Sequence, residues 1–143
     1  MINYDQIVLD AAASIRNASS QLGFKKVFAD ASDTDFMFEN TPLADVRFKR
    51  AVPVDQGGNI YYTAVVLEVE IGANDMTSRR ASAKIRNDLI QAVQAHFRAN
   101  LRFSGAIDTT LIGPVECEII ETDDQGAFIA SAILEIHALV YTG

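Results

Sequence analysis

The stretch LEVEIGANDMTSRRAS, residues 67–82, marks the point at which the pattern of the chain changes from strand to helix. In its first half, apolar residues alternate with Glu68 and Glu70, and this period of two is typical of a strand with one buried face. A turn-like segment rich in Gly, Asn and Asp follows, after which a helix is predicted to begin. Two adjacent arginines, Arg79 and Arg80, lie in its opening turns, where positive charge opposes the helix macrodipole.

The predicted helix continues from this point to about residue 100. Its core-facing stripe consists of apolar residues four positions apart: Ala81, Ile85, Leu89, Val93 and Phe97. Residues 76–102 contain six basic residues and one acidic residue, Asp88, and so carry a net charge of +5. Because the formal net charge of the whole chain is -7, the other 116 residues carry -12. The predicted helix is therefore a basic element in an acidic protein.

Strands are predicted on both sides of this helix. LADVRFKR (43–50) and IYYTAVVLEVEIGA (60–73) flank a segment with two glycines, which indicates a long hairpin. A second pair, TTLIGPVECEIIET (109–122) and AFIASAILEIHALVYT (127–142), is separated by another turn-forming segment. The last of these strands is partly apolar on both faces, so we expect it to be central or covered on both sides.

An amphipathic helix is predicted over residues 3–22, with Asn3 as its N-cap and Gly23 as its stop. The residues after it, 24–40, give a poor signal, with KKVFA as one possible short strand. Their apolar cluster, Phe36, Met37 and Phe38, belongs either to a loop packed over the core or to a surface arm that contacts a partner.

The order helix, hairpin, helix, hairpin predicts one α+β domain over residues 1–143. We expect a mostly antiparallel sheet of about four to five strands, with two main helices packed on one face. The length of 143 residues is enough for a real core, and no apolar run approaches the roughly 18 residues of a membrane helix. The N-terminus lacks the basic start of a secretory signal, which favours synthesis in the cytoplasm.

The sequence gives little sign of catalytic chemistry. We find no nucleotide-binding, zinc-protease, calcium-loop or serine-hydrolase motif, and we expect no enzyme activity, no cofactor and no metal site. Of the two histidines, His96 borders the apolar stripe of the basic helix and His137 lies on a strand face. The single cysteine, Cys117, occupies an inward position of its strand and is expected to pack in the core. A sequence pI near 4.7 makes specific nucleic-acid binding improbable.

The charged residues allow two interpretations each. Acidic residues project from three predicted strands at Glu68, Glu70, Glu116, Glu118 and Glu135. They form either a solvated sheet face or a negative surface that repels DNA in a channel. The basic helix presents Arg79, Arg80, Lys84 and Arg86. These residues form either a solvated helix face or a contact with the acidic surface of a neighbouring copy, as in heterologous ring assembly.

The order of helices and strands and the pattern of charged and apolar residues along the whole chain resemble those of the tail terminator (tail completion) proteins of long-tailed bacteriophages. The resemblance lies in the N-terminal helix, the PLADVRFKR strand, the long YYTAVVLEVEIGA strand, the basic helix and the two terminal strands. It implies a structural virion protein, assembled in the host cytoplasm, that forms a homohexameric ring in the tail or neck. Such a ring caps the tail tube, ends tube polymerisation and joins the head connector, while genomic DNA passes through without specific binding.

Other neck and head–tail adaptor proteins of similar small α+β fold are the alternative interpretation. A small ligand-binding domain or enzyme is a further one. By analogy with the terminators, residues 29–42 and 52–59 are candidate partner-contacting loops. The resemblance carries over no catalytic residues.

Overall fold

The computed structural model describes residues 1–31, 40–55, 58, 61–118, 120–122 and 126–142. Its elements follow the order predicted from the sequence, and their bounds are α1 (Tyr4–Asn17), α2 (Ser19–Leu22), β1 (Lys26–Ala29), β2 (Leu43–Asp55), β3 (Tyr61–Asp75), α3 (Arg79–Ala99), β4 (Thr109–Cys117), β5 (Glu121–Thr122) and β6 (Phe128–Tyr141). Together they form an α+β fold, which confirms the predicted fold class.

In the described part of the chain the sheet has six strands, in the order β1-β2-β3-β6-β4, with β5 also paired to β6. The predicted hairpin of β2 and β3 is present, and β6 runs antiparallel to both β3 and β4. The central place of β6 explains why both of its faces are partly apolar. The possible short strand in KKVFA is β1; it pairs with β2 in the parallel direction, so the sheet is mixed. The single strand predicted over residues 109–122 is divided into β4 and β5.

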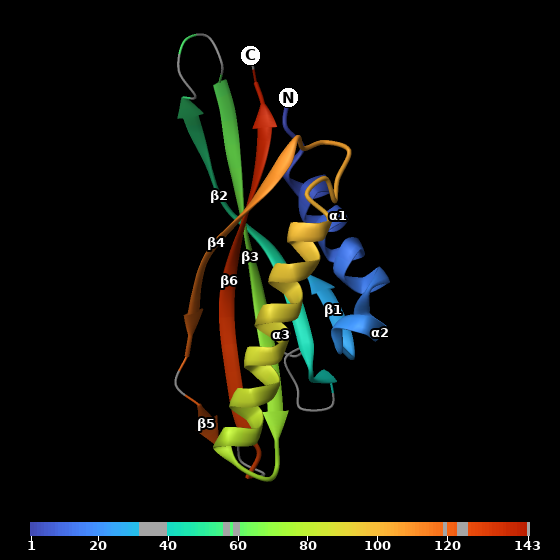
Figure 1. Cartoon of the computed structure of the whole chain (residues 1–143), viewed down its shortest axis with the longest axis vertical. Coiled ribbons are helices and arrows are strands. Elements are labelled where there is room, and N and C mark those ends of the chain that lie inside the picture. Colours follow the sequence, from blue (N-terminus) through green and yellow to red (C-terminus); the bar gives the residue numbers. More distant parts are fainter. Residues whose placement is uncertain (32–39, 56–57, 59–60, 119, 123–125, 143) are drawn as a thin grey trace.

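Both long helices cover the same face of the sheet (Figure 1). The core lies between these helices and the sheet. The central strands contribute alternate residues to it, all fully buried: Val65, Leu67 and Val69 of β3 and Leu134 and Ile136 of β6. No helix of the described residues packs on the other face, which is called the open face below. On β3 it contains Ala64, Val66, Glu68, Glu70 and Gly72, and on β6 it contains the odd-numbered residues 131–141.

Local signals explain where the helices begin and end. Asn3 accepts a hydrogen bond from the Gln6 backbone at 3.0 Å, as its N-cap position predicts. The predicted single helix is interrupted at Ala18, and α2 then ends at Gly23, whose φ of 99° is left-handed. Ser78 caps α3 by accepting a 3.0 Å hydrogen bond from the Ala81 backbone.

The prediction for Cys117 is wrong, because its side chain is exposed. Its position in the register points it to the helical side, opposite Ala132, but it ends the outermost strand of the sheet. At this edge the helices do not cover it, so strand alternation alone overestimated its burial. The apolar cluster of Phe36, Met37 and Phe38 lies outside the described residues.

No helix in the described part of the chain has the length and apolar character needed to cross a membrane.

Candidate functional site

The open face carries charged side chains from three neighbouring strands, β2, β3 and β6, in its half farther from the β2–β3 turn. The register places Asp45, Glu70 and Ile133 in one row across the sheet, and Arg47, Glu68 and Glu135 in the next. Glu68 and Glu135 lie directly opposite each other, an arrangement that is destabilising unless cations compensate it.

Arg47 provides part of that compensation. Its Nη1 lies 2.8 Å from Glu70 Oε1 and 3.4 Å from Asp45 Oδ2, and its Nε lies 3.9 Å from Glu68. Burial alone would lower the pKa of Arg47, but the hydrogen bond and charge of Glu70 and the charges of Glu68 and Asp45 raise it above its ordinary value. Arg47 therefore stays charged and holds three carboxylates together.

A second group of ion pairs, beside that of Arg47, forms around the carboxylate of Glu135, which is almost buried. Its Oε2 accepts a 2.7 Å hydrogen bond from Lys49 Nζ, while its Oε1 lies 3.5 Å from Arg50 Nη2 and 3.0 Å from His137 Nε2. Hydrogen bonds from Lys49 and His137, with the charges of Lys49 and Arg50, lower the pKa of Glu135 against the opposing effect of burial. The β2 bulge between Phe48 and Arg50 brings both cations to this one carboxylate.

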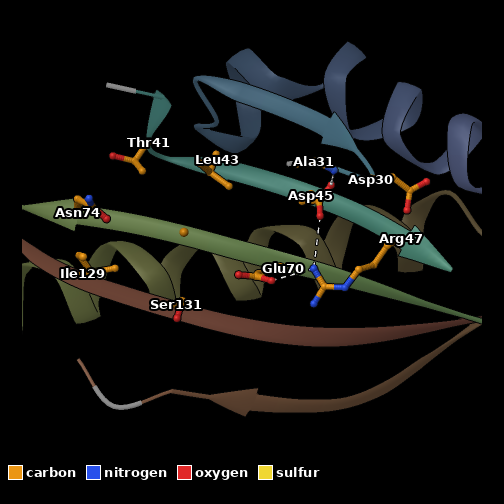
Figure 2. A pocket seen from close by; sticks show the side chains of 11 residues that line it. Asp30, Ala31, Thr41, Leu43, Asp45, Arg47, Glu70, Asn74, Ile129 and Ser131 are labelled. Atoms are coloured by element: carbon orange, nitrogen blue, oxygen red, sulfur yellow. Dashed lines mark hydrogen bonds and ion pairs between the residues drawn. The ribbon is translucent and has the colours of Figure 1, made fainter. Parts of the chain in front are cut away.

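A cleft of about 450 Å³ lies on the open face, and Arg47, Asp45 and Glu70 form part of its lining. Figure 2 shows Asp45 and Glu70 on either side of the Arg47 guanidinium, with Asn74 and Ser131 farther along the lining. Asp45 is only 1% exposed and accepts a 2.9 Å hydrogen bond from the Ala31 backbone. Burial raises the pKa of Asp45, although that hydrogen bond and Arg47 oppose the effect.

The half of the open face nearer the β2–β3 turn is apolar. Its rows contain Val52, Ala64 and Leu139, then Val54, Tyr62 and Tyr141. Tyr62 and Tyr141 pack edge to face, with ring centroids 5.7 Å apart. The β2–β3 hairpin, which contains Val52, Val54, Ala64 and Tyr62, extends beyond the ends of the helices (Figure 1).

The five predicted acidic residues all lie on the open side of the sheet, but they fall into two groups. Glu68, Glu70 and Glu135 are paired with cations from β2. Glu116 and Glu118, on or just after the edge strand β4, are exposed and form no ion pair with the described residues. The sequence missed this division, because the neutralising residues come from a different strand and are placed only by the register.

The basic residues of α3 also differ from one another. Arg79 donates a 2.7 Å hydrogen bond from Nη1 to the Ile120 carbonyl and lies over the Phe128 ring. Lys84 forms an exposed pair with Asp88 at 2.8 Å, and Arg86 donates to the Asn87 side chain. Arg80 is exposed and has no polar partner in the described ranges.

His96 joins the two long helices. Its Nε2 lies 2.7 Å from Ser14 Oγ, and the Asn100 amide nitrogen lies 3.5 Å from its Nδ1 while also donating to the His96 carbonyl. Burial lowers the pKa of His96 and so favours the neutral ring. These contacts make His96 a bridge between α1 and α3.

No protein-family model matches the chain, and no curated protein matches it significantly. Among solved structures 27 chains match, and one of them has a name that describes no function. That structure has a TM-score of 0.49 and 15% sequence identity, and the match covers 96% of this chain and 98% of the other.

Proposed function

We propose that the protein is a structural component of a phage virion that forms a ring, as a hexamer, on the end of the tail tube. In this role the ring ends polymerisation of the tube protein and provides the contact surface for the head connector. DNA passes through its centre without specific binding. The proposal combines the resemblance to tail terminators with the charge distribution of the folded chain.

The observation that carries the proposal is the position of the two charged surfaces. The basic side of α3 lies on the helical side of the sheet, whereas Glu116 and Glu118 project from the open side. One patch that meets a different patch on the next copy is a heterologous contact, and such contacts close into rings when the rotation allows it. A two-fold dimer would instead require both patches to lie on one self-complementary surface.

The projecting hairpin supports a contact with a further partner. Its exposed apolar residues include Val52 and Tyr61, and Tyr141 at the end of β6 is also exposed. Val52 lies within the segment 52–59 that the resemblance indicates as partner-contacting, and Tyr61 follows that segment closely. An apolar end that extends beyond the helices is suited to insertion against a tube or connector protein.

The test is electron microscopy of the purified protein, alone and mixed with tail tubes, together with its mass in solution. The expected result is a ring with a central opening that binds tube ends and stops tube growth. Rings that bind the connector but leave tube growth unchanged would favour the neck-adaptor alternative. A stable monomer at micromolar concentration, with no ring on tube ends, would refute the proposal.

A further inference from the structure

We infer that Arg80 and Lys84 on α3 of one copy pair with Glu116 and Glu118 on the β4 edge of the next copy. This inference rests on the proposed ring and identifies the surface through which adjacent copies recognise each other. The occupant of each patch is thus a second copy of the same chain.

The first step is the state of the basic pair. Arg80 lies in the first turn of α3, where its charge opposes the macrodipole, and no described residue offers it an anion. Lys84 has an in-chain partner in Asp88, but the two side chains are 74% and 62% exposed. A pair this exposed contributes little, so Lys84 is available to a stronger partner.

The second step is the state of the acidic pair. The Glu116 side chain is exposed and makes no described hydrogen bond or ion pair, and the Glu118 side chain accepts one described hydrogen bond, from the Ser131 hydroxyl at 3.2 Å. The other three predicted acidic residues already have cations. The two glutamates are therefore the acidic side chains of the predicted set that a neighbour can neutralise without breaking an internal ion pair.

The third step is geometry. Residues four apart on a helix are separated by about 6 Å along its axis, since each residue rises 1.5 Å. Residues two apart on a strand are separated by about 6.6 Å. A helix aligned with the strand edge can therefore form both pairs at once. Because the two patches project from opposite sides of one sheet, they are suited to a contact between copies.

The charge of the whole chain favours this partner over nucleic acid. The formal net charge of -7 would repel phosphate, whereas the next copy offers two unpaired carboxylates at matching spacing. Complementary charge of this kind mainly guides encounter and register.

The experiment reverses each pair and then restores it. We compare the wild type with R80E/K84E, with E116K/E118K and with the chain that carries all four changes, using sedimentation and electron microscopy. K25E/K26E is the matched control, because it makes the same charge change at two exposed residues that belong to neither α3 nor β4. Circular dichroism checks that every variant is folded.

Each reversal should weaken self-association by about tenfold or more, equivalent to about 1.4 kcal/mol, while the control should not. The fourfold variant should regain assembly. A mixture of the two double variants should also assemble, because the reversed patch of each fits the reversed patch of the other in an alternating ring.

Normal assembly of the folded double variants would overturn this pairing but leave the proposed function standing, provided that the wild type still caps tubes. Failure of both the mixture and the fourfold variant would also overturn it. So would binding of wild-type protein to duplex DNA that R80E/K84E alone abolishes. A wild type that never forms a ring would instead refute the proposed function itself.

Discussion

Two adjacent arginines at the start of α3 have different environments. Arg79 binds the Ile120 carbonyl and lies 5.8 Å from the centre of the Phe128 ring, so it connects the helix to the chain near β5 and β6. A cation in the first helical turn costs a few tenths to about 1 kcal/mol, and a charge-assisted hydrogen bond can offset that cost. Arg80 gains no such contact from the described residues, which is why it is central to the proposed interface.

Gly113 permits a close approach between β4 and β6. A Cβ at this position would lie 2.8 Å from Glu135 Cβ and 2.8 Å from His137 Nε2. We therefore expect Gly113→Ala to lower the free energy of unfolding by about 1–3 kcal/mol, as overpacking does. Urea denaturation measures this, with Gly105→Ala as control, because no heavy atom lies within 4 Å of a Cβ at residue 105. Equal stability of both variants would contradict the prediction.

The ion cluster around Glu135 predicts a pH-dependent contribution to stability. Its pKa is lower in the folded protein than in the unfolded chain, chiefly because of Lys49. The carboxylate therefore stabilises the fold above the usual glutamate pKa, and this contribution is lost as the pH falls through the lowered value. Glu135→Gln should cost about 1–2 kcal/mol near neutral pH.

The difference between wild type and Glu135→Gln should shrink steadily in acid. Denaturant unfolding over a pH series measures it. A difference that stays constant from neutral to acidic pH would show that the glutamate acts through packing alone. Lys49→Met provides a second check, because it removes the main partner while the carboxylate remains.

At the scale of elements, the start of α3 depends on two side chains in the turn before it. Asp75 accepts hydrogen bonds from the Thr77 backbone at 2.6 Å and the Ser78 backbone at 3.4 Å, and the Thr77 bond is the main cause of its lowered pKa. Ser78 then caps the helix. This arrangement fixes the direction in which the basic helix leaves β3.

Ser78→Ala should lower the free energy of unfolding by about 1 kcal/mol, because one backbone donor of the first turn loses its acceptor. Thermal or urea denaturation measures the change. Ser20→Ala is the matched control, since Ser20 is exposed and makes no described side-chain hydrogen bond. A similar loss in both variants would mean that the cap is not what stabilises this end of α3.

The elements that were predictable from the sequence are those with strong local patterns. The period of two in β3, the four-residue spacing in α3 and the caps at Asn3 and Gly23 each determine local geometry over short distances. The parallel pairing of β1 could not be read in this way, because it joins segments through the sheet and not through a turn.

The candidate site was less predictable than the fold, for a related reason. The outward direction of Glu68, Glu70 and Glu135 follows from alternation alone. Their neutralisation by Arg47, Lys49 and Arg50 depends on the register of β2 and on its bulge, neither of which has a local signature. Exposure of Cys117 likewise depends on which strand forms the edge of the sheet.

At the scale of the whole molecule, the proposed ring should be sensitive to salt. Raising the ionic strength from about 0.1 M to about 1 M shortens the Debye length from about 10 Å to about 3 Å and screens exposed charges. We expect the assembled mass measured by sedimentation to fall while the circular dichroism of the chain stays unchanged. An assembly that is unaffected or strengthened by salt would indicate an apolar interface, such as the Val52 and Tyr141 region.

The central place of β6 also has a consequence for the order of folding. Its ladder with β3 pairs Asp75 with Phe128 at one end and Tyr62 with Tyr141 at the other, so the paired residues are 53 to 79 positions apart. Closing loops of this size costs entropy before any contact is gained, and such topologies fold slowly. The β2–β3 hairpin can form early, but its inner edge stays unpaired until β6 arrives. During that interval the unpaired edge of β3 can pair with a strand of another chain. Aggregation is therefore expected when many copies are unfolded at high concentration.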